Sequence, residues 1–145
     1  MGFSNVHRDG AVILVERETM GKHNQIVGKM GETLAREYLE AKGLSFVSAN
    51  YRTSHGEIDL IFTEGSQRVF VEVKTRTTDD YGNGEVAVSH RKLSALFFAA
   101  ETYLVDQNLP NDDWRIDVIV VERKTNKGNF EIVQFENVGL GEDYE

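Results

Sequence analysis

Two runs of alternating apolar and polar residues stand out in the centre of the chain, at residues 57–62 and 68–75. The residues between them, 64–67, include Gly65 and Ser66 and are typical of a tight turn. The pattern predicts an antiparallel hairpin with Thr63 opposite Arg68.

The register of this hairpin predicts that charged residues meet on one face. Asp59 then lies opposite Glu72 and Glu57 opposite Lys74. The apolar residues of both strands form the other, core face: Ile58, Leu60, Phe62, Val69, Val71 and Val73.

Two carboxylates directly opposite each other repel, so we expect a compensating cation, either Lys74 or a metal ion. Paired carboxylates suit Mg²⁺, and a lysine beside such an ion could orient the water that attacks a phosphodiester. A solvated cluster of ion pairs without catalytic role explains the same three residues, Asp59, Glu72 and Lys74, equally well from the hairpin alone.

The flanking segments predict two helices and three further strands. Apolar residues recur at three- and four-residue steps along 26–42 and 90–107, with Gly43 as a C-terminal stop and Ser89 as an N-cap. Strands are predicted at 44–51, 114–122 and 130–135, and a loop at 75–85. The order αβββαββ indicates an α/β fold with a central mixed sheet flanked by helices.

Length and composition fit one domain. The 145 residues are 40% hydrophobic and include no cysteine, which excludes a disulfide scaffold and fits the cytoplasm. We expect a flexible extension at 1–25, a single domain at 26–138 and an acidic tail at 139–145. The aliphatic run at 11–15 is too short for a membrane span.

The net charge of −8 opposes tight binding to nucleic acid through a broad basic surface. A carboxylate metal site would itself concentrate negative charge that a bound ion neutralises. Candidate contacts to nucleic acid are therefore sought among individual cationic side chains: Arg52, His55, Arg76, His90, Arg91 and Lys92. The last three crowd the first turn of the second predicted helix, where cations oppose the helix dipole.

Glu32 lies at the rim of the apolar stripe of the first predicted helix, so that helix could lean this carboxylate toward the hairpin. Glu32, Asp59 and then Glu72-Val73-Lys74, in this order, resemble the PD-(D/E)XK nuclease superfamily with its restriction-endonuclease-like core. More narrowly, the segments GKMGETLAREYL, NYRTSHGEIDLI, VFVEVKTR and WRIDVIVV look like the bacterial YraN family of predicted endonucleases, relatives of archaeal Holliday-junction resolvases. The chain departs from the superfamily pattern at Ile58, where a proline is usual.

The resemblance implies a role for each residue of the array. Asp59 and Glu72 would be ligands of Mg²⁺ or Mn²⁺, Glu32 and the Val73 carbonyl further ligands, and Lys74 the residue that orients the attacking water. The implied activity is hydrolysis of phosphodiester bonds in DNA, on branched or otherwise structured substrates, with a homodimer as a further expectation. The alternative is a catalytically silent nucleic-acid-binding or assembly module that retains the fold.

Overall fold

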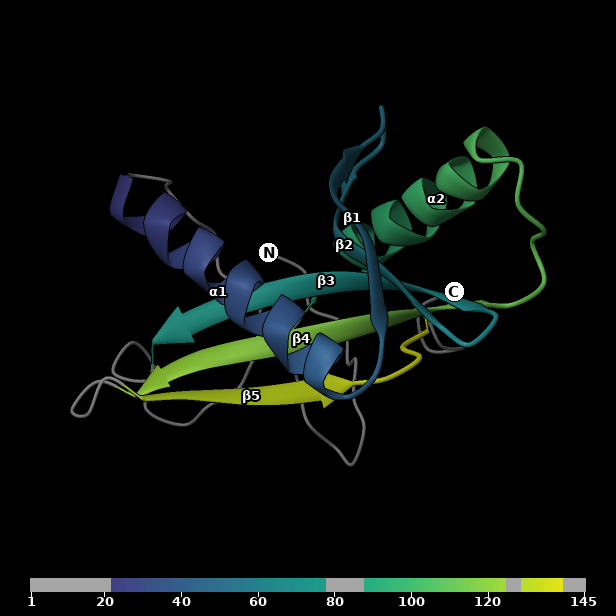
Figure 1. Ribbon diagram of the computed structural model, residues 1–145. Helices are drawn as coiled ribbons and strands as arrows, with labels where there is room; N and C mark the ends of the chain where they lie inside the picture. Colours follow the sequence, from purple (N-terminus) through teal and green to yellow (C-terminus); the bar gives the residue numbers. More distant parts are fainter. Residues whose placement is uncertain (1–21, 78–87, 125–128, 140–145) are drawn as a thin grey trace.

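The computed structural model describes residues 22–77, 88–124 and 129–139. Within these ranges the elements follow the predicted order αβββαββ (Figure 1): α1 (Lys22–Ala41), β1 (Ser45–Arg52), β2 (Glu57–Glu64), β3 (Gln67–Thr77), α2 (His90–Asp106), β4 (Trp114–Lys124) and β5 (Asn129–Phe135). The α/β class with a mixed central sheet is thus confirmed. The predicted loop at 75–85 was wrong for residues 75–77, which continue β3 because they pair with β4. The predictions for residues 1–21, 78–85 and 140–145 fall outside the described residues.

The five strands lie in the sheet in their order along the chain, β1-β2-β3-β4-β5. Neighbouring strands are antiparallel except β3 and β4, which are parallel. A parallel pair needs a crossover, and here α2 supplies it, as the sequence pattern predicted.

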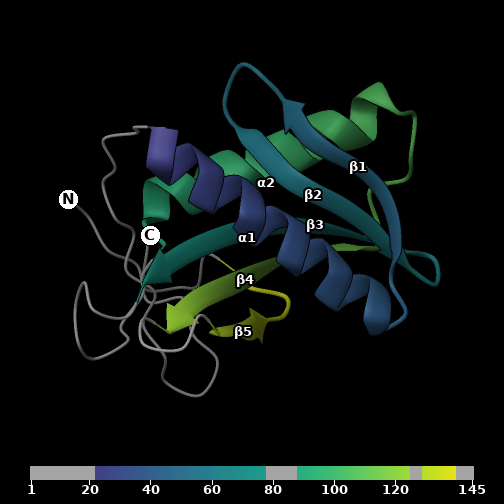
Figure 2. The same ribbon diagram turned by 60° about the vertical axis from the view of Figure 1, so that its left-hand side comes forward.

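Each face of the sheet is covered by one helix (Figure 2). Ala35 and Leu39 of α1 pack on the face that carries Leu60, Phe62, Val69 and Val71. Leu93, Leu96 and Ala100 of α2 pack on the opposite face, against Ile61 and Phe70. The expectation that only one face of the hairpin is core was therefore wrong, because α2 buries most of the face that carries Glu72.

The element boundaries agree with the sequence pattern where a specific residue fixes them. The Ser89 hydroxyl accepts a hydrogen bond from the backbone N–H of Lys92 at 3.1 Å and caps α2. Gly43 follows α1 in a left-handed conformation, with φ of 102°. Helix α1 begins at Lys22, earlier than the predicted residue 26. The apolar repeat did not reveal this start, because residues 22–25 are polar.

The hairpin has the predicted register for only part of its length. The paired residues run from Glu64 and Gln67 to Leu60 and Val71. Beyond that point β2 stays paired with β1, through Ile58 and Glu57. The β1–β2 ribbon therefore turns away from β3 and rises out of the plane of the other strands (Figure 1).

This divergence changes the neighbours of two predicted residues. Ile58 packs with Ile61 in the core under α2 instead of following Leu60 and Phe62 onto the α1 face. Glu57 forms an ion pair with Arg52 at 3.1 Å rather than pairing with Lys74. The register predicted from the turn was wrong for these positions, since it assumed that the ladder continues to the end of the hairpin.

Candidate functional site

The Asp59 carboxylate lies where β2 and β3 separate. Its Oδ2 accepts a hydrogen bond of 2.8 Å from the backbone N–H of Val73, beyond the last backbone pair, Leu60 with Val71. Burial raises the pKa of Asp59 well above its ordinary value, and the nearby Glu72 carboxylate raises it further; the Val73 N–H and the Lys92 ammonium act in the opposite direction. Asp59 is therefore directed toward the gap between the strands, close enough to Glu72 to feel its charge. The two residues are not the directly opposite pair that was predicted, because the β2–β3 ladder ends at Leu60 and Val71.

The Glu72 carboxylate is almost completely enclosed, with 2% of the residue exposed. Its Oε2 lies 3.5 Å from the Nζ of Lys92, on α2. Its Oε1 is buried and accepts no hydrogen bond from any residue that the structure describes. Because a buried carboxylate oxygen without a donor is costly, this atom requires an explanation.

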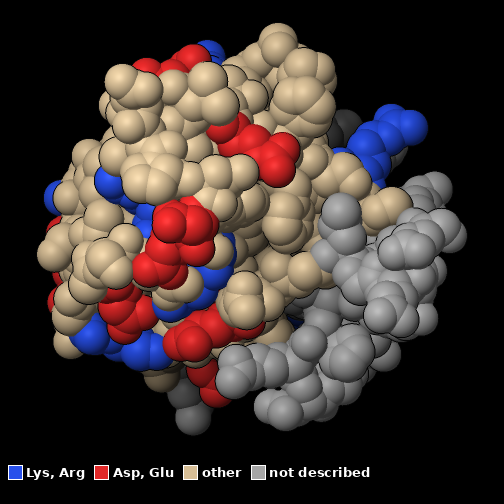
Figure 3. All heavy atoms as spheres, turned by 90° about the vertical axis from the view of Figure 1, so that its right-hand side faces the viewer, with Lys and Arg blue, Asp and Glu red and all other residues tan. Residues whose placement is uncertain are grey.

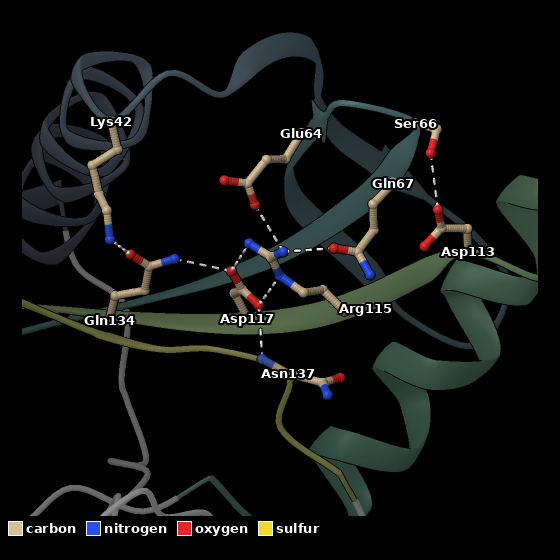
Figure 4. A network of polar contacts seen from close by, with 9 residues as sticks. All are labelled: Lys42, Glu64, Ser66, Gln67, Asp113, Arg115, Asp117, Gln134 and Asn137. Atoms are coloured by element: carbon tan, nitrogen blue, oxygen red, sulfur yellow. Dashed lines mark hydrogen bonds and ion pairs between the residues drawn. The ribbon is translucent and has the colours of Figure 1, made fainter.

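A second buried carboxylate in the same sheet shows how this chain satisfies such a group. Asp117 of β4 is 0% exposed and accepts two hydrogen bonds from Arg115, one from the Gln134 side chain and one from the backbone N–H of Asn137 (Figure 4). Arg115 and Asp117 are two residues apart, so they share one face of β4, where they pair. Compared with Asp117, Glu72 is only half-satisfied, because one of its two carboxylate oxygens has a partner among the described residues and the other has none.

Helix α1 brings Glu32 to the same end of the sheet. Gly31 packs directly on Thr75 of β3, where a Cβ atom at Gly31 would lie 1.8 Å from the Thr75 Oγ1. Burial raises the pKa of Glu32, and Glu57 and Glu72 raise it further against the effect of Lys29. Glu32 in turn raises the pKa of Asp59, so the carboxylates of Glu32, Asp59 and Glu72 are near enough to interact electrostatically.

The cation beside these carboxylates is Lys92. No ion pair joins Lys74 to Asp59 or Glu72 within the part of the chain that the structure describes, although Lys74 is half-buried on the same face of β3 as Glu72. Glu72 is the main cause of the raised pKa of Lys92. Sequence reasoning placed Lys92 among the nucleic-acid contacts and missed this pairing.

The other predicted nucleic-acid contacts occupy different environments. Arg52 is exposed, and the His55 ring stacks on Phe98 of α2 with centroids 4.0 Å apart. Arg76 is buried and lies 3.2 Å from Glu122, a position that does not suit a contact to a polymer. Arg91 is exposed in the first turn of α2.

The donor set fits a divalent ion that keeps several waters. Among residues 22–77, 88–124 and 129–139, no group of three or more His, Cys, Asp or Glu side chains lies close enough together to hold a metal ion alone. Asp59 and Glu72 remain as two hard oxygen donors, one with an unpartnered atom. This matches Mg²⁺ sites, in which one or two carboxylates bind and water completes the shell.

A broad basic surface at the opposite end of the sheet would be an alternative site for nucleic acid. On the face shown in Figure 3, acidic and basic side chains of the described residues are interspersed, without a broad positive area. In the described ranges, neither helix combines the length and apolar content that crossing a membrane requires.

Comparison with known proteins gives one consistent relationship. The model of the uncharacterised protein family UPF0102 matches residues 31–121, a segment that contains Glu32, Asp59, Glu72, Lys74 and Lys92. A UPF0102 protein of Vibrio parahaemolyticus is 43% identical over 96 residues, which cover 66% of this chain and 79% of the relative. A UPF0102 protein of Alkaliphilus oremlandii is 36% identical over 114 residues, which cover 79% of this chain and 97% of the relative.

Proposed function

Because this chain belongs to the UPF0102 family, the YraN family related to PD-(D/E)XK nucleases, we propose that it is a divalent-metal-dependent endonuclease that hydrolyses phosphodiester bonds in DNA. The observation that carries the proposal is the Glu72 Oε1 atom, buried and without a hydrogen-bond donor among the described residues, beside the protonation-prone Asp59. Such an atom is explained if its partner is a cation that binds from solution.

Asp59 and Glu72 are the proposed metal ligands, with Mg²⁺ or Mn²⁺ as the ion. In an extended strand the N–H and C=O of one residue face the same neighbouring strand. Since the Val73 N–H is donated to Asp59, we expect the Val73 carbonyl to face the same gap and to serve as a third oxygen donor. Glu32 is half-buried and near enough to Glu72 to interact electrostatically, which suits a contact through water.

A divalent ion held there would polarise a phosphoryl oxygen and lower the pKa of a bound water. Lys74 is the proposed water-orienting residue, because it is two positions beyond Glu72 on the same face of β3. The resemblance to Holliday-junction resolvases supports branched or structured DNA as the substrate class. A small number of local contacts, including Arg91, suits a chain with net charge −8 better than a broad basic surface does.

The proposal is tested by cleavage of junction, flap and single-stranded DNA with Mg²⁺ or Mn²⁺. Wild type should cleave at least one of these substrates, and Asp59→Asn, Glu72→Gln and Lys74→Ala should each lose activity by about 10²-fold or more, as expected for groups that act at the reacting phosphate. Circular dichroism confirms that each variant is folded. Equal cleavage by all four proteins would assign the activity to a contaminant.

A second candidate, a catalytically silent DNA-binding or assembly module, is favoured by one observation. Within the described residues, no group of three or more His, Cys, Asp or Glu side chains lies close enough together to hold a metal ion, so metal binding would depend on few side-chain ligands. Salt-sensitive DNA binding without metal uptake or cleavage would support this alternative.

A further inference from the structure

Lys92 is the cation paired with Glu72, one of the two carboxylates proposed as metal ligands. Its Nζ is 3.5 Å from the Glu72 Oε2, and the fields of Asp59 and Glu57 act on it as well. The lysine comes from α2, whereas the carboxylates come from β2 and β3, so the contact is made only when the helix is docked on the sheet.

This ion pair is asymmetric in a way that favours exchange. The Glu72 side chain is 3% exposed and cannot move into water, but the Lys92 side chain is 44% exposed. A lysine carries its charge on a flexible four-carbon stem, so the ammonium can leave Glu72 without any movement of the backbone. The pair also leaves Glu72 Oε1 without a donor, which shows that one ammonium does not complete the site.

We propose that Lys92 is a resident counterion which holds Glu72 in the metal-free protein and is displaced from it by a divalent ion. The inference rests on the proposed metal site. Lys92 neutralises part of the negative charge of Glu32, Asp59 and Glu72 and thereby stabilises the folded protein in the absence of metal. Because the ammonium and the metal both interact with the single Glu72 carboxylate and repel each other there, they compete, and Lys92 lowers the affinity for the metal.

The test is calorimetric titration of Mn²⁺ into wild type, Lys92→Gln, Lys92→Arg and Arg91→Gln. Lys92→Gln should bind Mn²⁺ about tenfold more tightly than wild type, which corresponds to ~1.4 kcal/mol. Lys92→Arg keeps the competing charge and should stay close to wild type. Arg91→Gln removes the same formal charge from the same helical turn, at an exposed side chain, and should also leave the affinity unchanged.

Thermal unfolding provides a second measurement that a purely structural role of Lys92 would not reproduce. Without metal, Lys92→Gln should melt below wild type, because the glutamine amide can donate to Glu72 but carries no charge. Saturating Mn²⁺ should raise the melting temperature of Lys92→Gln more than that of wild type. A deficit that Mn²⁺ does not reduce would contradict the exchange.

The outcomes separate this inference from the proposed function. Equal or weaker Mn²⁺ binding by Lys92→Gln, or equal tightening in Arg91→Gln, would overturn the role of Lys92 while leaving the metal site intact. Tighter binding by Lys92→Gln in a protein that cleaves none of the DNA substrates would support the counterion role and reject the nuclease. If neither protein binds Mn²⁺, both conclusions are wrong.

Discussion

Gly31→Ala tests how α1 is docked on the sheet, and Gly28→Ala is its matched control. A Cβ atom at Gly31 would lie 1.8 Å from the Thr75 Oγ1 and 3.0 Å from the Thr75 Cβ, whereas a Cβ at Gly28 would have no neighbour within 4 Å. Both positions are helical, so both alanines should gain about 1 kcal/mol of helix propensity over glycine. Only the alanine at Gly31 must also displace a neighbour.

The magnitude follows from that contact. Rotation of the Thr75 side chain can move Oγ1, but the Thr75 Cβ stays at 3.0 Å unless the backbone shifts. Overpacking of this kind costs about 1–3 kcal/mol. Since the propensity gain is common to both variants, Gly31→Ala should be less stable than Gly28→Ala by the whole of that amount. Thr75→Ala added to Gly31→Ala should recover part of the loss, because it removes Oγ1 and keeps Cβ.

Urea denaturation followed by circular dichroism measures the free energies of unfolding, with unchanged m values as the check that the same transition is compared. If Gly31→Ala proves as stable as Gly28→Ala, α1 does not rest on Thr75. Glu32, the next residue of the helix, would then have no fixed place beside the carboxylates.

Three further predictions concern stability in the absence of metal. Asp59 binds its proton more tightly in the folded than in the unfolded chain, so the free energy of unfolding should fall as pH rises above about 4. This one group can lower it by no more than about 1.4 kcal/mol per pH unit. Unfolding measured in EDTA at a series of pH values should show a shallower fall for Asp59→Asn than for wild type. Asp117→Ala leaves the Arg115 side chain, 10% exposed, without its main partner and should cost about 3–5 kcal/mol in urea denaturation, whereas Glu64→Ala, at a 49% exposed partner of the same arginine, should cost less than about 1 kcal/mol. Ser89→Ala removes the cap of α2 and should lower the unfolding free energy by about 1 kcal/mol, and a change below a few tenths would contradict the capping geometry.

The sequence pattern predicted the local elements well because each depends on a repeat or a terminal residue close in the chain. The hairpin register follows from its turn, where Gly65 takes a φ of 60°. The two-sided core was missed although the pattern contained it. Ile61 and Phe70 are apolar residues on the same face as Asp59, Glu72 and Lys74, and they belong to the core under α2.

The parts of the site that could not be predicted depend on distant elements. Local alternation cannot show that β2 leaves β3 after Leu60, since that depends on the pairing with β1. One feature of the sequence could have identified Lys92 as a neighbour of the carboxylates. Lys92 stands four residues before the buried Leu96, at the rim of the apolar stripe of α2, and the same argument that selected Glu32 would have selected it.

The order of the strands has a consequence for how the protein folds. Each strand lies beside its neighbour in the chain, so the β2–β3 hairpin can form early, at low entropic cost, before β4 pairs with β3. Asp59 and Glu72 lie just beyond the paired part of this hairpin, so both would still be hydrated at that stage and would lose water when α2 packs on the sheet. We therefore expect the repulsion between the Asp59 and Glu72 carboxylates to slow the late packing of α2 on the sheet and to leave formation of the β2–β3 hairpin unaffected.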